Sequence, residues 1–407
     1  MRDTMNSYMH KPILLSPVGD FERLEMALHY GADAVYLAGQ EFGMRASAGN
    51  FDAEQMERAI ALCHSKGVQV HVTCNTTPRE DELVRLPAFL EQLDAFGADA
   101  IIAADLGVFG MVKKYAPHVE LHASTQLGVT NSATATMLHD MGATCVVLAR
   151  ELSLEDVAAV RAATPKELAL EGFVHGAMCV SFSGRCLLSN YLTGRDANRG
   201  ACAQPCRWTY HLVEEKRPDE KFTIFEDKGT HILNSRDMCM IEHLPKLLNA
   251  GISTLKIEGR MKSAYYCAAV TNAYRNALDA AIAGEPLDPI WLEEVNKVSH
   301  RPYSTGFYFG EPGQHYPDSM YFADADVCAV VESCDADGNA QLTQRNRFFV
   351  GDTVELLVRG QKPIRFVVEA MQNAEGEAIE SAPHPMMPLQ MRLPVFADRL
   401  SILRKLK

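Results

Sequence analysis

From Lys11 to about Gly284, the chain alternates short runs of apolar residues with longer segments of mixed polarity. In segments such as 20–31, 53–67, 85–97 and 154–164, the spacing of apolar residues predicts amphipathic helices. The short runs resemble strands that are buried on both faces of a parallel sheet. Eight such strands are predicted, beginning near Ile13, Ala34, Val68, Ala100, Val119, Cys145, Leu168 and Thr254.

A repeated junction connects helices to strands in this region. In 29–39, 95–105, 140–150 and 249–259, a glycine suited to ending a helix precedes a run of small and β-branched residues. Eight strands alternating with helices predict an α/β fold, a (β/α)8 TIM-like barrel. A doubly wound open sheet is the alternative, although the GxGxxG turn that would favour it is absent from the sequence.

The pattern changes towards the C-terminus. After a connector at 299–313, the chain from about Tyr321 to Lys407 consists mainly of alternating or β-branched segments separated by turns. We expect a small all-β barrel of about eighty residues, similar in size to barrels of RNA-handling proteins. A domain that serves only for packing is the alternative. The sequence thus predicts a barrel domain over 1–316 and a C-terminal domain over 317–407.

Composition narrows the class of protein. Hydrophobic residues make up 47% of the chain and charged residues 22%, as in ordinary globular proteins. The absence of a long uncharged apolar stretch excludes a membrane-spanning helix, and residues 1–12 lack the apolar core of a signal peptide. We therefore expect a cytoplasmic protein. The formal net charge of −13 argues against indiscriminate binding to nucleic acid, but it permits a local basic patch.

Four of the 11 cysteines crowd into one segment, with six, fifteen and three residues between successive members: Cys179, Cys186, Cys202 and Cys206. A disulfide framework suits small secreted domains rather than a chain of this length. Structural zinc usually takes two tight pairs of ligands, and only the last two cysteines form one. An iron–sulfur cluster tolerates wider spacing. Spacing alone leaves iron–sulfur, zinc and unliganded thiols open.

The cysteine segment falls in an insertion, about 176–253, between the seventh and eighth predicted strands. Loops at the carboxyl ends of the strands form the active-site face of barrel enzymes. We therefore expect the cysteines to share that face with polar residues at the other strand ends: Asn75, Asp105, Ser124, Gln126, Arg150, His175 and Glu258.

Several motifs resemble those of a known family. Residues 171–189, EGFVHGAMCVSFSGRCLLS, closely resemble the signature of the collagenase-like peptidases of family U32, and residues 14–39 and 255–266 are also similar to it. Within that family, residues 198–218 and 233–248 look most like the tRNA-hydroxylating branch.

The resemblance implies oxygen-independent, prephenate-dependent 5-hydroxylation of the wobble uridine in the tRNA anticodon loop. It also implies a 4Fe-4S cluster held by Cys179, Cys186, Cys202 and Cys206. Cys239 is the reserve ligand if Cys202 and Cys206 are too close to serve together, and an electron-transfer partner is a further hypothesis. Related branches hydroxylate an rRNA cytidine or quinone precursors, which are alternative substrates.

Further site residues follow as hypotheses. Prephenate carries two carboxylates, so arginine side chains are the expected clamps, with Arg45, Arg150 and Arg260 as candidates. Glu258 is a candidate acid–base group. Stacking and phosphate contacts recognise single-stranded RNA loops. Candidates for these contacts are Arg345, Arg347 and Phe348 in the C-terminal domain, and Arg195, Arg199 and Trp208 near the cysteines.

Peptidase activity is the alternative from another class. The zinc motif HExxH and the serine motif GxSxG are both absent from the sequence. A cysteine nucleophile would need a histidine base, for which His175 beside Cys179 is the candidate. Four clustered cysteines are better explained as metal ligands. A noncatalytic RNA-binding or scaffold protein is the third possibility.

Overall fold

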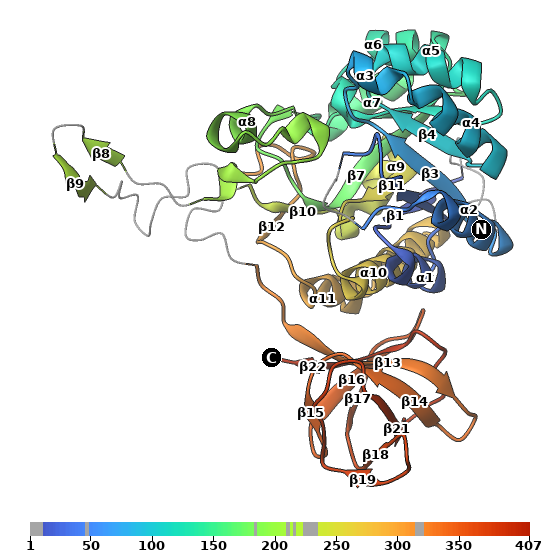
Figure 1. Cartoon of the computed structure of the whole chain (residues 1–407), viewed down its shortest axis with the longest axis vertical. Coiled ribbons are helices and arrows are strands. Elements are labelled where there is room, and N and C mark those ends of the chain that lie inside the picture. Colours follow the sequence, from blue (N-terminus) through green and yellow to red (C-terminus); the bar gives the residue numbers. More distant parts are fainter. Residues whose placement is uncertain are drawn as a thin grey trace.

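The computed structural model describes residues 11–44, 49–182, 185–208, 212–214, 217–222, 235–313 and 321–407. Within them, a helix-covered barrel is followed by a β-sheet domain, which lies below the barrel in Figure 1. The predicted domain boundary at residues 316 and 317 lies outside the described residues, as does the candidate clamp Arg45. No helix in the described ranges combines the length and the apolar character needed to span a membrane.

The predicted (β/α)8 barrel is confirmed. Eight parallel strands pair in the order β11-β1-β2-β3-β4-β5-β6-β7, and pairing of β7 with β11 closes the ring. The predicted strand starts differ from the observed ones by at most two residues. The strands are β1 (Ile13–Pro17), β2 (Ala34–Leu37), β3 (Gln69–Cys74), β4 (Ala100–Ala103), β5 (Glu120–Ala123), β6 (Ala143–Val147), β7 (Ala169–Ala177) and β11 (Thr254–Ile257).

Helices surround this barrel, and all of them except the short α3 (Glu80–Leu83) have apolar residues that are buried. Gly97, at φ 76°, ends α4 in the left-handed conformation that the junction pattern requires. Asp52 and Gln55 form a capping box at the start of α2. The helices are α1 (Phe21–His29), α2 (Ala53–Ser65), α3 (Glu80–Leu83), α4 (Leu86–Phe96), α5 (Leu106–Tyr115), α6 (Ser132–Asp140), α7 (Leu154–Ala162), α9 (Leu244–Asn249), α10 (Ala264–Ala283) and α11 (Ile290–Asn296).

The insertion between β7 and β11 extends the sheet beyond the ring. Strand β10 (Asp237–Cys239) of the insertion runs antiparallel to the end of β7, and β12 (Tyr303–Ser304), which follows α11 in the chain, pairs with β10. The insertion projects to one side of the barrel in Figure 1. The insertion also contains α8 (Leu188–Thr193), 3₁₀ turns at Ala197–Arg199, Pro205–Arg207 and Ile241–His243, β8 (Leu212–Glu214) and β9 (Arg217–Phe222). Outside the insertion, a 3₁₀ turn at Thr125–Leu127 follows β5.

The C-terminal domain is all β, as predicted. Its main sheet is antiparallel, in the order β17-β16-β22-β13-β14-β21-β18-β19, and β15 pairs with β20. The strands are β13 (Ala325–Cys334), β14 (Asn339–Gln344), β15 (Phe348–Phe349), β16 (Thr353–Leu357), β17 (Ile364–Val367), β18 (Met371–Asn373), β19 (Ala378–Ile379), β20 (Ser381–Ala382), β21 (Pro388–Arg392) and β22 (Ile402–Leu406).

A buried ionic network joins the two domains. Arg404 on β22 is fully buried and donates two hydrogen bonds to Glu294 of α11, at 2.6 and 2.7 Å. It also donates to Glu355 of β16, at 2.8 and 3.1 Å. Lys297 bonds both carboxylates, at 2.9 and 3.1 Å. Two cations and two carboxylates therefore compensate one another where water is largely excluded.

We expect Arg404→Met to destabilise the whole chain. The substitution leaves Glu294 and Glu355 with Lys297 as the remaining cation of the network, and an uncompensated buried charge costs about 3–5 kcal/mol. Urea denaturation measures the loss. The matched control is Arg399→Met, which removes an exposed ion pair to Glu25 and should cost under about 1 kcal/mol. Equal small losses for both variants would contradict the structural role of the network.

Candidate active site at the carboxyl end of the barrel

A cavity of about 490 Å³ opens at the carboxyl end of the barrel strands. Its wall combines residues from strand ends with residues of the insertion. All four clustered cysteines line it, so the structure brings them to the face on which they are expected: Cys179, Cys186, Cys202 and Cys206.

None of these four cysteines forms a disulfide, and the thiols of Cys179 and Cys202 lie near enough to Cys206 to affect it. The sulfurs of Cys186 and Cys202 each accept a backbone N–H from two residues later, at 3.4 Å. Burial raises the pKa of the Cys206 thiol; Arg207 opposes this shift, and the thiols of Cys179 and Cys202 add to it. The four thiols are the residues of this cavity that can hold a soft metal centre.

Hydrogen bonds hold the two halves of the cysteine segment together. Asn198 accepts from the backbone N–H of Cys186 at 3.3 Å and donates to its carbonyl at 3.2 Å. The buried hydroxyl of Ser189 accepts from the backbone N–H of Ala203 at 2.9 Å. These bonds hold the backbone at Cys186 and next to Cys202 in place.

Cations outnumber carboxylates around this cavity. Glu258, which directly follows β11, is the acidic residue of its wall. The basic residues are Arg150, Arg207, Lys256, Arg260 and Lys262. Such a wall favours an anionic ligand.

Two of the candidate arginine clamps reach the cavity. Arg260 is largely buried and donates to Thr73 Oγ1 at 3.0 Å and to Asn50 Oδ1 at 2.7 Å. Arg150 donates to the carbonyl of Ala177 at 2.9 Å, and its guanidinium lies 3.9 Å from the centre of the Phe173 ring. These contacts hold both guanidinium groups in place at the cavity wall.

Two lysines of the wall, Lys256 and Lys262, are not among the residues predicted from the sequence. Burial lowers the pKa of Lys262, whose ammonium group donates to the Ser299 carbonyl at 2.8 Å. Lys256 points into the barrel and pairs with the buried carboxylate of Glu171 at 2.6 Å. Both belong to the segment 255–266, and Lys256 is a charged residue within a strand whose other residues are uncharged. That interruption is the signal that could have identified it.

Strand-end polar residues divide into two groups. Asn75, Ser124 and Gln126 line the cavity and are linked, because Asn75 and Ser124 donate to the same Gln126 oxygen at 2.7 and 3.1 Å. Asp105 instead caps α5 by accepting the backbone N–H groups of Gly107 and Val108. It is not among the described residues of the wall.

The structure does not bring His175 to the cavity. Its ring nitrogens lie 3.2 Å from the Tyr274 hydroxyl and 3.3 Å from the Tyr303 hydroxyl, and burial lowers its pKa to about 3. A register shift in the pairing of β7 with β11 pairs His175 with Ile257. Such a bulge reverses the facing of the residues that follow it, and this turns His175 away from the barrel interior. The prediction that His175 serves as the base for a Cys179 nucleophile is therefore wrong.

Cys239 also lies away from the cavity wall. It pairs with His175 across β10 and β7, and its sulfur is 3.8 Å from the Tyr274 hydroxyl. Burial raises the pKa of this thiol to about 11. The structure thus separates the reserve ligand from the four clustered cysteines.

Candidate RNA contacts in the C-terminal domain require a correction. Phe348 is fully buried in the domain core, so it cannot stack on a base, whereas its neighbour Phe349 is 42% exposed. The Arg347 guanidinium lies 4.9 Å from the centre of the Phe349 ring. Arg345 is engaged with the barrel, donating to Glu22 at 2.8 Å. Arg347 and Phe349 are therefore the exposed pair.

Candidate contacts near the cysteines also differ in their availability. Arg199 forms a two-pronged ion pair with Glu82 of α3, at 2.6 and 2.8 Å, which ties the insertion to the barrel. Arg195 is exposed and donates to the carbonyl of Ala201 at 3.0 Å. Trp208 is 41% exposed. Arg195 and Trp208 thus remain accessible, whereas Arg199 is occupied.

Comparison with known proteins places this geometry in a family. The family model described as "Peptidase family U32" matches residues 19–317, and "Peptidase family U32 C-terminal domain" matches residues 323–404. The chain is 36% identical to the tRNA hydroxylation protein P of Escherichia coli, over 92% of each chain. It is 35% identical to tRNA hydroxylation protein P1 of Bacillus subtilis, over 94% of this chain and 92% of the relative.

A relative with a different name is also similar to this chain. The chain is 32% identical to the collagenase of Porphyromonas gingivalis, over 73% of each chain. The two family models together cover the barrel, the cysteine-bearing insertion and the C-terminal sheet. On this evidence, the chain belongs to peptidase family U32.

Proposed function

We propose that this protein is a tRNA-modifying enzyme that hydroxylates the wobble uridine at C5, using prephenate and a 4Fe-4S cluster. The observation that carries the proposal is the meeting of four thiols and five cationic side chains on one cavity at the active-site end of a barrel. Relatives named tRNA hydroxylation protein P support tRNA as the substrate class. A tRNA substrate fits a cytoplasmic location.

The arrangement of the thiols fits a cluster better than a single zinc ion. A tetrahedral zinc site, with zinc–sulfur bonds of about 2.3 Å, holds its sulfurs within about 4 Å of one another. Among the described residues, no three of the four cysteine sulfurs lie within 4.8 Å of one another. A cluster of several iron atoms spreads its ligands further apart, and backbone N–H groups directed at cysteine sulfurs tune such clusters.

Such a cluster, when bound, supplies redox chemistry that ordinary side chains lack. The protein holds the thiols, orients the substrates beside them and excludes water from the reacting atoms. An external electron-transfer partner is part of this proposal. Glu258 is the proposed acid–base group, because it is the acidic residue of the wall.

The cationic wall supports prephenate as the small-molecule substrate. A dicarboxylate is best held by charge-assisted hydrogen bonds from fixed donors. Arg150 and Arg260 are anchored at the wall by their contacts to Ala177 and Thr73, and Lys262 adds a third positive charge. Arg45 stays a prediction outside the described residues.

For tRNA, the exposed aromatic and basic residues provide stacking and phosphate contacts. Trp208 lies close in sequence to two of the cysteines, and the Arg347–Phe349 pair lies on the C-terminal domain. Both sites are local features of a chain with net negative charge. They are the proposed contacts to the anticodon loop.

Peptidase activity is the second candidate, favoured by the name of the Porphyromonas relative. The described structure gives the thiols no histidine base, since His175 is enclosed by Tyr274 and Tyr303. Hydroxylation of an rRNA cytidine or a quinone precursor would use the same cavity. Robust gelatin hydrolysis by protein prepared without iron would favour the peptidase over the hydroxylase.

Replacing any one of Cys179, Cys186, Cys202 and Cys206 by Ala is expected to remove the brown absorbance of anaerobically purified protein. The same variants should fail to restore 5-hydroxyuridine in tRNA from cells lacking the protein, as measured by nucleoside mass spectrometry. Cys334→Ala, in the C-terminal domain, is the control and should retain both properties. If a variant that lacks two of the four cysteines still hydroxylates tRNA, the bound metal has at most a structural role.

Arg150→Met is expected to raise the KM for prephenate by about tenfold or more. A hydrogen bond between charged partners contributes about 1.5–3 kcal/mol, which the methionine side chain cannot supply. Steady-state kinetics at saturating tRNA measure the change. Arg392→Met removes an exposed arginine of the C-terminal domain and should leave this KM unaltered. An unchanged KM in Arg150→Met would remove this arginine from the proposed clamp.

Joint replacement of Arg347 and Phe349 by Ala is expected to weaken tRNA binding by about tenfold, since stacking on an aromatic ring contributes about 1–3 kcal/mol per base. Filter binding at two salt concentrations measures the affinity, with cluster content checked by absorbance. Arg365→Ala removes an exposed arginine of β17 in the same domain and serves as the control. If the double variant binds as tightly as Arg365→Ala, the C-terminal domain lies outside the RNA site.

A further inference from the structure

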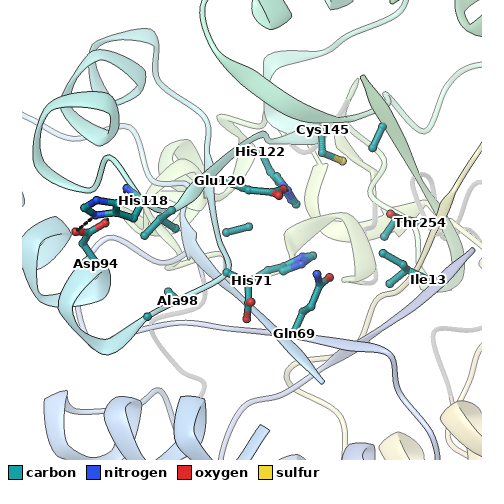
Figure 2. Close-up of a pocket in the computed structure, with 15 residues that line it drawn as sticks. Ile13, Gln69, His71, Asp94, Ala98, His118, Glu120, His122, Cys145 and Thr254 are labelled. Atoms are coloured by element: carbon teal, nitrogen blue, oxygen red, sulfur yellow. Dashed lines mark hydrogen bonds and ion pairs between the residues drawn. The ribbon is translucent and has the colours of Figure 1, made fainter. Parts of the chain in front are cut away.

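A second cavity, of about 470 Å³, opens at the opposite end of the barrel. Figure 2 shows His71 and His122 projecting into it, with Glu120 beside His122. The four clustered cysteines do not belong to its wall, so it is separate from the candidate active site.

Three potential metal ligands meet here, namely two histidines of the cavity wall and the fully buried Glu171. Ligand atoms of His71, His122 and Glu171 all lie within 4.8 Å of one another, and these residues form the one such group of three among the described residues. They come from β3, β5 and β7, which are alternate strands of the barrel. Side chains from alternate strands share one layer of a barrel interior, and this explains how residues far apart in sequence converge.

Each of the three residues has a buried side-chain atom that lacks a hydrogen-bond partner. Nδ1 of His71, Nδ1 of His122 and Oε2 of Glu171 have none, while the three residues are only 3%, 5% and 0% exposed. A buried polar atom without a partner costs free energy. Two imidazole nitrogens and a carboxylate oxygen that share one space would be satisfied together by a single cation.

The surroundings of His122 suit a metal ligand. Its Nε2 lies 3.3 Å from Oε2 of Glu120, which also accepts from the Thr144 hydroxyl at 3.1 Å. Histidines that bind metals commonly donate their second ring N–H to a carboxylate, which leaves the other nitrogen with a lone pair for the ion. The contact to Glu120 therefore favours the tautomer in which the unpartnered Nδ1 is the ligand.

Glu171 can serve an ion without losing its present partner. Lys256 bonds its Oε1 at 2.6 Å, whereas the unpartnered atom is Oε2. The lysine charge opposes a nearby cation. Asp94, Asp99 and Glu120 line the cavity and supply negative charge along the path by which an ion would enter.

We propose that His71, His122 and Glu171 form a binding site for one divalent transition-metal ion at the amino-terminal end of the barrel. Two imidazoles and one carboxylate suit zinc, iron or cobalt, whereas magnesium prefers oxygen ligands. The ion would crosslink β3, β5 and β7. Since catalytic sites of this fold lie at the other end, the proposed role is stabilisation of the barrel. The proposal does not depend on the proposed function.

The test compares the metal content of anaerobically purified full-length variants after equilibration with Zn²⁺ and removal of free ion. His71→Leu and His122→Leu should each hold one zinc ion fewer than the wild type, with equal iron and sulfide in all preparations. His118→Leu is the matched control, because His118 lines the same cavity but is 85% exposed and bonded to Asp94. Zn²⁺ should raise the Tm of the wild type and of the control by several degrees, and Mg²⁺ should not.

Equal zinc content in the wild type and both histidine variants would overturn the proposal. If the leucine variants do not fold, X-ray absorption spectroscopy of zinc bound to the wild type tests the proposal instead. A shell of nitrogen and oxygen neighbours near about 2.0–2.1 Å supports the site, whereas sulfur neighbours alone, near about 2.3 Å, overturn it. Because iron and sulfide are measured in every sample, failure of this site is distinguishable from failure of the cysteine site.

Discussion

The pairing of β7 with β11 is the constraint on which the rest of the structure depends. These strands are separated by the whole insertion, yet their register closes the ring, with Thr254 beside Glu171 and Lys256 beside Phe173. Closure places the insertion at the carboxyl end of β7, where its cysteines meet the ends of the other strands. The same register positions Lys256 to reach Glu171. A shift in this pairing would alter the site and the barrel interior together.

The barrel interior has apolar and charged parts. Leu15, Ala34, Tyr36 and Ile102 form an apolar cluster of their own. Elsewhere inside lies the buried Lys256–Glu171 ion pair, and Lys256 also belongs to the wall of the cavity that the cysteines line. Burying two charges has a desolvation cost that only good geometry and further bonds offset. A buried ion pair such as Lys256–Glu171 fits a barrel interior that binds a ligand as well as providing a packed core.

The sequence predicted the fold because strand and helix periods, and the glycine at each junction, are local signals. It also identified the cysteines that line the cavity, along with Arg150, Arg260 and Glu258. What it could not supply depends on pairing between distant segments. The bulge that turns His175 outward exists only in the β7–β11 register.

Two further differences have the same origin. Phe348 and Phe349 are adjacent residues of the same type, and the packing of the domain decides which of the two side chains is buried. His71, His122 and Glu171 lie on three separate strands, and the sequence around each one does not indicate the partners that ring closure brings beside it. Such clusters become visible only after the barrel has closed.

The Arg404 network also determines which pieces of this protein can be studied separately. Glu294 belongs to the barrel and Arg404 to the last strand of the sheet domain, so each domain completes the charge balance of the other. A recombinant fragment that ends before the sheet domain would leave the Glu294 carboxylate without Arg404 and exposed to water. The loss of activity in such a fragment would therefore report impaired folding, and it would reveal little about whether the missing domain takes part in the reaction.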